Sequence, residues 1–342
     1  MSTTRKLLRI GIVGAGWPAE RHADGYRDCE NVAVVAVADL DETRRERFAR
    51  QYGVPRQYGE YNELLADPEI DAVSITLPNF LHRPATVAAL EAHKHVLCEK
   101  PPAMTQSEAR QMAEVASRRG LVLTYALQRR FTAPMVELRA AIEAGRLGDV
   151  YHARAVWTRA WGVPKGLDGW FTDPARAGGG ALIDIGVHVL DMAWYQLGCP
   201  QPLTVSGQVH HRFPDLTRTE DAAFAFIRFA GGASLELAAS WVLAQEADHM
   251  GVSFYGTRAG ARVDDTNLEL YTVGAEGRTR TGRTSSDALA GFRGETKNFV
   301  AAVRGEAEPS APGDQGAVLM AMLEAVYDSS THGTEVTLAA PR

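Results

Sequence analysis

The sequence predicts an α/β protein with a doubly wound parallel sheet followed by a second α/β domain with a large open mixed or antiparallel sheet. The first 125 residues alternate short apolar runs with helical patterns. After about Phe131 the pattern changes to several long strands of alternating polarity. A turn with dinucleotide-loop spacing, 14–19, lies between the first strand and the first helix. A chain of 342 residues suits two domains, which we place at 1–126 (Rossmann) and 127–342.

The elements of the first domain follow one another in strict β–α alternation. Residues 32–39 form a nearly continuous apolar run, as expected of a strand with both faces covered. Such alternation predicts parallel strands joined by right-handed crossovers. The predicted strands are 7–13, 32–39, 72–76, 96–98 and 121–125, and the predicted helices are 18–27, 42–52, 82–92 and 105–119.

The second domain begins with a helix at 134–144 and a strand at 150–158. A flexible glycine run and a helix through Leu197 follow. Gly231-Gly232 and Asp264-Asp265 are turn signals between later strands. Further strands are predicted at 203–212, 221–229, 233–242, 250–256, 261–265 and 267–273, a polar mobile loop at 274–290, and helices at 292–304 and 313–331.

Composition excludes several classes of protein. A net charge of −6 argues against nucleic-acid binding, which depends on clustered Lys and Arg. No apolar run reaches eighteen residues, so no membrane span is expected. The basic N-terminus leads directly into the first strand, which leaves no room for a signal peptide. Three widely spaced cysteines indicate reduced thiols and a cytoplasmic location.

The turn between the first strand and helix has the features of a pyrophosphate-binding loop. Gly14 permits the tight turn and Gly16 allows close approach of the backbone to a phosphate. Ala19 permits close packing of helix on strand, and Pro18 fits the first helical turn. The helix N-terminus then presents N–H groups to an anion.

Asp39 ends the second strand, 25 residues after Gly14, where an acidic residue binds the adenosine ribose hydroxyls. Its charge would repel a 2′-phosphate, and Leu40 offers no cation to attract one. Arg44 and Arg45 are expected on a solvated helix face. These residues favour NAD over NADP.

Two motifs end neighbouring strands at the carboxyl edge of the sheet, where such sheets bind ligands: 76–79 and Glu99-Lys100-Pro101. Lys100 can donate a hydrogen bond to a reacting oxygen and favour a developing alkoxide. A lone lysine is more often simply solvated. The Lys100-Pro101 bond is a candidate for the cis isomer.

Asp184, His188 and Asp191 share one helical face by their i, i+4, i+7 spacing. Metal ligation is conceivable at that spacing, but no further His or Cys lies nearby, so we predict an acid–base site without a metal. The pKa of histidine, ordinarily about 6.5, suits proton transfer near neutral pH. The alternative for His188 is a buried core histidine.

Taken together, these motifs resemble the glucose–fructose oxidoreductase / inositol dehydrogenase / MocA (Gfo/Idh/MocA) family over nearly the whole chain. The order of the EKP and DxGxH motifs is the most specific part of the resemblance. The landmarks are GAGWPA (14–19), TLPNFLH (76–82), CEKPPAMT (98–105), QRRF (128–131), GGGALIDIGVHVLD (178–191) and YGTRAG (255–260).

The resemblance implies that Lys100 binds the reacting hydroxyl and that His188 is the general acid/base. Asp184 would orient His188 or hold a neighbouring substrate hydroxyl. It also implies sheet-to-sheet dimers that often pair into tetramers. The candidate cofactor-binding residues are Gly14, Gly16, Trp17, Pro18, Asp39, Thr76, Pro78, Asn79, His82, Glu99, Lys100 and Gln128, and the candidate substrate-binding residues are Lys100, Trp161, Trp170, Asp184 and His188.

The predicted function is NAD-dependent hydride transfer at a secondary alcohol of a sugar, sugar derivative or inositol. Trp161 and Trp170 flank a Gly/Pro-rich loop and can pack on sugar C–H faces, whereas Trp157 is expected in the core. A non-catalytic NAD-binding regulator on the same fold is an alternative, although such a protein would be expected to lose Lys100 or His188. A second alternative is a reductase of imines or tetrapyrroles. The Asp184–His188 pair favours alcohol and ketone chemistry over that alternative.

Overall fold

A computed structural model describes residues 6–164, 167, 169–274, 277–284, 287 and 289–338. The chain divides into two compact units. The first comprises Met1–Gln128 with Leu289–Ala317, and the second Arg129–Ala288 with Val318–Arg342. No helix in the described ranges is long and apolar enough to cross a membrane.

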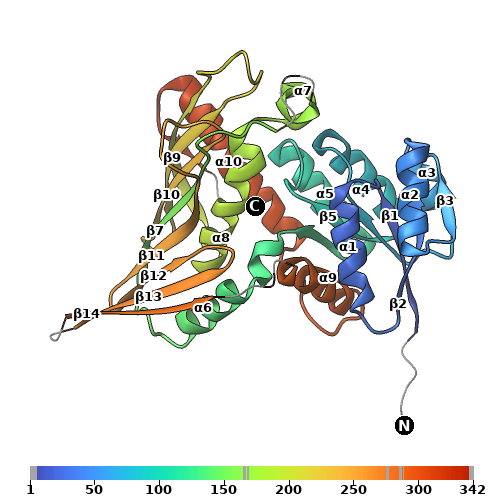
Figure 1. Ribbon diagram of the computed structural model, residues 1–342, viewed down its shortest axis with the longest axis horizontal. Helices are drawn as coiled ribbons and strands as arrows, with labels where there is room; N and C mark the ends of the chain where they lie inside the picture. Colours follow the sequence, from blue (N-terminus) through green and yellow to red (C-terminus); the bar gives the residue numbers. More distant parts are fainter. Residues whose placement is uncertain are drawn as a thin grey trace, which may run out of the picture. The chain divides into compact units, whose positions relative to one another are not determined.

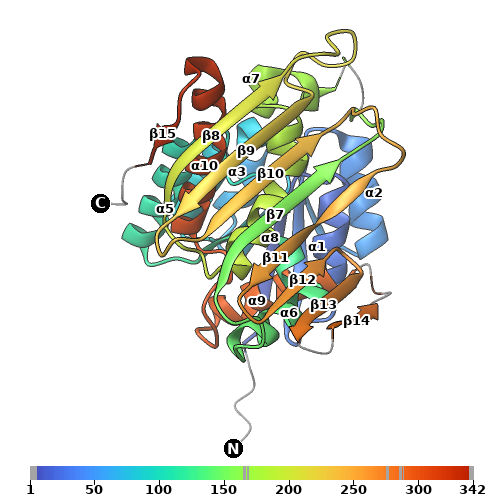
Figure 2. The same cartoon turned by 90° about the vertical axis from the view of Figure 1, so that its left-hand side faces the viewer.

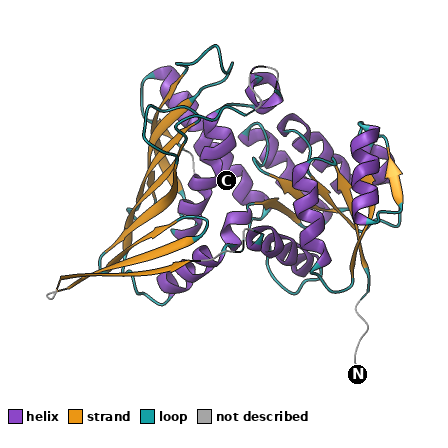
Figure 3. Cartoon of the chain, viewed as in Figure 1, coloured by secondary structure: helices purple, strands orange, loops and turns teal. Residues whose placement is uncertain are grey.

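The first unit contains a parallel six-stranded sheet of order β3-β2-β1-β4-β5-β6, with helices on both sides (Figures 1 and 3). The strand order reverses between β1 and β4, where doubly wound sheets bind ligands. This confirms the predicted Rossmann fold. The strands are β1 Leu8–Val13, β2 Val32–Ala38, β3 Arg56–Tyr58, β4 Ala72–Ile75, β5 His95–Glu99 and β6 Leu123–Ala126.

The helices of this unit begin and end at residues suited to those positions. Asp41 caps α2 by accepting a hydrogen bond from the Arg44 N–H, and Thr105 caps α5 in the same way. Gly53 and Gly120 end these helices in the left-handed conformation. The helices are α1 Trp17–Arg27, α2 Glu42–Tyr52, α3 Tyr61–Ala66, α4 His82–Glu91, α5 Gln106–Arg119 and α9 Ala290–Val303, with the short turn η1 Asn79–Leu81. A second short turn, η2 Gln128–Phe131, begins at Gln128 and continues into the second unit.

Residues 289–317, which we expected in the second domain, group with the first unit. Phe299 and Val300 of α9 belong to the same core cluster as Ile10 and Ile12 of β1. An apolar helix face can be buried against either domain, and its position along the chain does not reveal which.

The second unit contains a mixed nine-stranded sheet of order β14-β13-β12-β11-β7-β10-β9-β8-β15, seen face-on in Figure 2. β7 and β10 are parallel, and the other pairs are antiparallel. The open mixed sheet is therefore confirmed. Its strands are β7 Val150–Thr158, β8 Pro202–His210, β9 Ala222–Phe229, β10 Ser234–Ser240, β11 His249–Gly256, β12 Ala259–Val263, β13 Asn267–Gly274, β14 Gly277–Thr284 and β15 Val336–Thr337.

Helix α8 (Val187–Gln196) packs against β7, β10 and β11 on one face of this sheet. A π-helix, η5 (Leu182–Gly186), leads directly into it. In Figure 2, none of the described helices that belong to the second unit lies in front of the sheet. The remaining helices are α6 Ala133–Glu143, the short η4 Trp170–Thr172 and α7 Pro174–Ala177, and α10 Gly313–His332.

The loop predicted at 274–290 is wrong for 277–284, which form β14 along the whole of β13. β14 is an edge strand whose sequence, GRTRTGRT, is polar at every side-chain position. Such a strand shows no hydrophobic alternation, so its sequence resembles a loop. Residues 275, 276, 285, 286 and 288 lie outside the described part of the chain.

Candidate active site

The glycine turn of the first unit joins the end of β1 to the start of α1. Gly14 has φ +92°, and a Cβ there would lie 2.8 Å from the Thr76 carbonyl oxygen. Gly16 is the N-cap of α1 and supplies no side-chain cap. A Cβ at Gly16 would meet only Pro18 Cδ, at 3.5 Å, so this side of the turn is open. Pro18 has no N–H and Ala19 N donates to the Gly16 carbonyl oxygen at 3.1 Å, so in this first turn the N–H of Trp17 is the group that can meet an anion.

Asp39 ties the end of β2 to this turn. Its Oδ2 accepts a hydrogen bond from Ala15 N at 2.7 Å, and its Oδ1 accepts one from Asp41 N at 2.9 Å. The expectation that Arg44 and Arg45 are both solvated is wrong for Arg45, whose Nη1 donates to the Asp39 carbonyl oxygen at 2.7 Å. Arg44 Nη1 lies 3.4 Å from Asp39 Oδ2. The first turn of α2 folds back over the strand end and brings both guanidinium groups to Asp39.

The loop after β4 is bound to its neighbours on both sides. Thr76 Oγ1 donates to the Gly14 carbonyl oxygen at 2.6 Å. His82 is buried, with Nδ1 2.8 Å from the Pro101 carbonyl oxygen and Nε2 2.8 Å from that of Leu77. Burial lowers the pKa of His82 in spite of these contacts. His82 therefore joins the two loops that carry the predicted motifs.

The buried Glu99 side chain binds the backbone N–H of Lys100. Its Oε2 accepts a hydrogen bond from Lys100 N at 3.0 Å, and its Oε1 lies 3.2 Å from His22 Nε2. Glu295 Oε1 is 3.6 Å from the same nitrogen. Burial alone would raise the pKa of Glu99, but His22 and Lys100 lower it overall. Burial and the Glu99 charge raise the pKa of Glu295 well above its usual value. The two shifts favour the charged form of Glu99 and the protonated form of Glu295.

The remaining predicted cofactor residues also belong to the first unit. Lys100 is partly buried, and its bond to Pro101 is cis. Trp17 is 59% exposed and meets Phe292 edge-on, with ring centroids 6.4 Å apart. Gln128 Oε1 is buried without a hydrogen-bond partner in the described structure, and so is available to a ligand. Pro78 and the buried Asn79 follow β4. Eleven of the twelve thus follow the carboxyl ends of β1, β2, β4, β5 and β6, and Glu99 is the last residue of β5.

Asp184 and His188 lie in the second unit, on η5 and on the first turn of α8. Asp184 Oδ2 accepts a hydrogen bond from the indole Nε1 of the fully buried Trp241, at 3.1 Å. His188 is 6% exposed. Asp191 has a different partner, because its carboxylate is bound by the buried Arg130, with Nε to Oδ2 at 3.0 Å. Asp191 is therefore a structural ion-pair residue.

Trp157, which we expected in the core, packs against the core cluster that contains Trp241, and it also lies next to His188, which the sequence did not predict. Its ring centroid lies 5.5 Å from that of His188 at an interplanar angle of 44°. The guanidinium of Arg129 lies 4.5 Å from the Trp157 ring centroid. Burial lowers the pKa of Arg129 to about 10, and Asp265 forms an ion pair with it. The available signal was the position of Trp157 in β7, because side chains two residues apart in a strand point to the same face. Ala153 and Ala155, which share that face with Trp157, are fully buried.

Trp161 and Trp170, which we expected at the substrate, lie in the segment between β7 and α7. Trp161 is 67% exposed. Trp170 stacks on Phe171 with ring centroids 3.9 Å apart. The Trp161 ring is therefore exposed enough to contact a substrate, whereas one face of the Trp170 ring is covered by Phe171.

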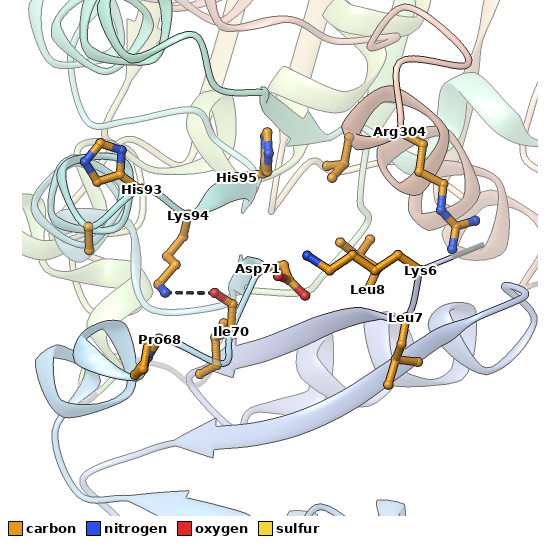
Figure 4. Close-up of a pocket in the computed structure, with 12 residues that line it drawn as sticks. Lys6, Leu7, Leu8, Pro68, Ile70, Asp71, His93, Lys94, His95 and Arg304 are labelled. Atoms are coloured by element: carbon orange, nitrogen blue, oxygen red, sulfur yellow. Dashed lines mark hydrogen bonds between the residues drawn. The ribbon is translucent and has the colours of Figure 1, made fainter. Parts of the chain in front are cut away.

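A pocket of about 460 Å³ in the first unit lies away from these loops (Figure 4). Its lining includes residues that precede or begin β1, β4 and β5, at the amino-terminal edge of the sheet. Lys94 Nζ donates to the carbonyl oxygens of Asp67 and Ile70, both at 2.8 Å, and Arg304 donates to that of Glu30. Lys94 and Arg304 thus already donate to carbonyl oxygens of the chain. The pocket also lies at the edge of the sheet opposite to the one where such sheets bind cofactors. In the described ranges, no group of three or more His, Cys, Asp or Glu side chains is arranged to hold a metal ion.

Comparison with known proteins gives matches along most of the chain. Residues 8–127 match the family model described as oxidoreductase family, NAD-binding Rossmann fold (GFO_IDH_MocA), and residues 135–262 match the GFO/IDH/MocA C-terminal domain. A D-glucoside 3-dehydrogenase from Escherichia coli (strain K12) is 35% identical, over 98% of this chain and 99% of its own length. A 1,5-anhydro-D-fructose reductase from Ensifer adhaerens is 30% identical, over 96% and 97%.

Solved structures are similar over the whole chain. An NAD binding oxidoreductase from Klebsiella pneumoniae is 26% identical with a TM-score of 0.85, covering 98% of this chain and all of that one. A levoglucosan dehydrogenase in complex with NADH and levoglucosan has a TM-score of 0.89 at 22% identity, covering 97% and 99%. At that identity the likeness concerns the fold.

Proposed function

Because the chain belongs to the Gfo/Idh/MocA oxidoreductase family, we propose that it is an NAD-dependent dehydrogenase acting on a secondary ring hydroxyl of a pyranose or its glycoside. The observation that carries this proposal is the full-length identity of 35% with a D-glucoside 3-dehydrogenase. The relatedness to a 1,5-anhydro-D-fructose reductase supports a six-membered sugar ring as the substrate class.

The residues of the first unit fit an NAD molecule. The open side of Gly16 and the uncapped N-terminus of α1 suit a pyrophosphate, and the Asp39 carboxylate suits the ribose hydroxyls. The buried, unpartnered Gln128 Oε1 suits a donor such as a carboxamide. When bound, NAD supplies C4 of its nicotinamide as the hydride acceptor.

We assign the proton chemistry to three residues. His188 takes the hydroxyl proton as the carbon–hydrogen bond of the alcohol breaks, so that the substrate leaves as a ketone. The Lys100 ammonium donates a hydrogen bond to the reacting oxygen and favours its developing negative charge. Asp184, held by Trp241, orients His188 or binds a neighbouring hydroxyl. Trp157, next to His188, and the exposed Trp161 are the aromatic candidates for the sugar face.

The proposal includes a homodimer, or a dimer of dimers, formed through the open face of the nine-stranded sheet. It also includes a cytoplasmic location, because none of the three cysteines is in a disulfide.

The test is an assay of NADH formation, by absorbance, with purified protein, NAD and a panel of glucosides, free hexoses, anhydrosugars and inositols. We expect glucosides or anhydrosugars to be oxidised to keto-sugars with the highest kcat/KM, and product analysis to locate the new carbonyl on a ring carbon. Preference for an inositol would contradict the proposed substrate class. Absence of turnover with every polyol would contradict the enzymatic proposal itself.

A further inference from the structure

Glu220 lies just before β9 and is 2% exposed. Its carboxylate accepts hydrogen bonds from Gly180 N at 2.7 Å and Leu182 N at 3.0 Å. Its main-chain carbonyl oxygen accepts one from Ala181 N at 3.2 Å. The Tyr327 hydroxyl of α10 donates to the same carboxylate at 2.9 Å. One residue thus binds three consecutive peptide N–H groups at the start of the segment that carries Asp184.

The glycine run before this segment is held tightly, contrary to the expected flexibility. A Cβ on Gly180 would lie 2.0 Å from the Glu220 carbonyl oxygen. A Cβ on Gly179 would lie 2.2 Å from the Tyr327 hydroxyl oxygen. Both distances are far below van der Waals contact, so larger residues would push the loop off Glu220 and Tyr327. Close approach to these two groups explains why glycine occupies both positions.

The anchored residues begin the π-helix that leads to the acid–base pair. Leu182 is the first residue of η5, and Asp184 N donates to the Gly180 carbonyl oxygen at 2.9 Å. The Asp221 carbonyl oxygen accepts a hydrogen bond from Trp241 N at 2.9 Å, and Trp241 binds the Asp184 carboxylate. The dipeptide 220–221 therefore binds both the backbone before Asp184 and the backbone of Trp241, whose side chain contacts Asp184. π-Helical turns are rare and are often found at functional sites.

A buried carboxylate is a costly way to hold a loop. Its desolvation is only partly offset by the hydrogen bonds it accepts, and apolar packing of similar volume would often be at least as stable. What the carboxylate adds is direction, because two oxygens fix the orientation of two separate peptide groups. A role in geometry accounts for Glu220 better than a role in stability.

We propose that Glu220, together with Tyr327, is a positioning residue of the reaction: it fixes the start of η5 and so directs Asp184 and His188 at the substrate. The inference rests on the proposed roles of Asp184 and His188. Neither Glu220 nor Tyr327 touches the reacting atoms in this scheme, and both act through the segment 180–188.

The experiment compares the full-length protein with Glu220→Gln, Tyr327→Phe and a control, Ser329→Ala. Gln keeps one acceptor but turns an NH₂ group toward a peptide N–H, and Phe removes one donor to Glu220. Ser329 is also on α10 and 4% exposed, but its hydroxyl binds Gly207 N and the Thr334 carbonyl oxygen instead. The readouts are kcat, KM for substrate, Kd for NAD, and amide hydrogen exchange of the peptide covering 178–188. His188→Asn is assayed in parallel.

We expect Glu220→Gln to lower kcat by about 10–100-fold with the Kd for NAD unchanged, because small misplacements of reacting groups have large effects on rate. Exchange over 178–188 should become faster in Glu220→Gln and, to a smaller extent, in Tyr327→Phe, while Ser329→Ala retains wild-type exchange there and wild-type kcat. If Glu220→Gln does not fold, Tyr327→Phe decides: a lower kcat with faster local exchange supports the proposal, and no change in either overturns it.

Folded Glu220→Gln with wild-type kcat, or with unaltered exchange over 178–188, would also overturn the proposal. The parallel His188→Asn variant separates this failure from that of the proposed function. Loss of turnover in His188→Asn with normal kcat in Glu220→Gln would reject the positioning role alone. Full turnover in His188→Asn would instead reject the acid–base assignment on which the inference rests.

Discussion

At the scale of single residues, Lys100 and His188 are the side chains that the proposed chemistry requires. Lys100→Met and His188→Asn should each keep NAD affinity, because both residues act on the substrate oxygen and its proton. Turnover should fall by about 10²–10⁴-fold, the usual contribution of general acid–base groups. Steady-state kinetics with NAD binding measured separately would check this. A loss of less than about fivefold in kcat for His188→Asn, with chemistry rate-limiting, would make the assignment wrong.

The residues around Asp39 determine cofactor choice. Its carboxylate should favour NAD over a 2′-phosphorylated cofactor by charge repulsion. Asp39→Ala should therefore narrow the ratio of kcat/KM for NAD over NADP. The ratio should fall further than the loss of the Asp39 charge alone predicts. Arg44 lies 3.4 Å from this carboxylate, and without it the Arg44 guanidinium could pair with the 2′-phosphate of NADP. The matched variant Asp39→Ala with Arg44→Ala should lose that gain. A wild-type enzyme that used NADP as well as NAD would contradict the argument.

At the scale of secondary structure, the first unit was largely predictable because its signals are local. The run 32–39 is a strand covered on both faces, and the structure has β2 at Val32–Ala38. Helix 42–52 was predicted to the residue, since Asp41 caps it and Gly53 ends it. β3 and α3 were missed because three and six residues are too short to show a period.

The candidate site was less predictable, because its side chains come from elements distant in sequence. Motif spacing identified Asp184 and His188, yet their contacts with Trp241 and Trp157 depend on the pairing of β7, β10 and β11. The glycine run suggested flexibility, although Gly179 and Gly180 pack closely on Tyr327 and Glu220, and Gly178 ends α7 in the left-handed conformation. Sequence patterns cannot distinguish a glycine that moves from one that allows close contact.

Glu220 should also make stability depend on pH. Burial raises its pKa to about 7 from an ordinary value of 4.5, despite the hydrogen bonds from Leu182, Tyr327 and Gly180. The folded state therefore holds the proton more tightly than the unfolded state. Its contribution to stability is complete below pH 4.5 and is lost as pH rises through 7. The loss between pH 5 and pH 8 should be about 2–3 kcal/mol, at about 1.4 kcal/mol per pKa unit.

This pH dependence can be isolated by comparing wild type with Glu220→Gln, which does not titrate. Urea unfolding at pH 5 and pH 8 gives the free energy of unfolding of each protein. The advantage of wild type over the variant should be smaller at pH 8 by about the same 2–3 kcal/mol. Other titrating groups, Glu295 among them, cancel in this difference. An advantage that is equal at both pH values would show that Glu220 does not titrate in this range.

At the scale of the whole molecule, the face of the nine-stranded sheet opposite α8, its open face, is the surface that we expect a second subunit to cover. The side chains of Phe224 and Tyr255 are 38% and 42% exposed. His152 stacks between Phe226 and Tyr255, with ring centroids 6.4 Å and 5.6 Å away. These aromatic side chains share the face with the exposed ion pair of Arg154 and Glu236, and partly apolar surfaces of this kind are typical of association sites. A second copy related by a two-fold axis would bury both faces at once.

Ala238 offers the sharpest test of this assembly. It pairs with Phe224 on one side and Val156 on the other, in the middle of the open face. Ala238→Arg should weaken the dimer, because a large charged side chain would be buried in the middle of the proposed interface. NAD affinity should persist, since the cofactor residues belong to the first unit. Val136→Arg, at a 54% exposed position on α6, controls for added charge. Light scattering at micromolar concentration should give at least twice the chain mass for wild type and for Val136→Arg, and a lower mass for Ala238→Arg. A wild-type protein with the mass of a single chain would refute the proposed assembly.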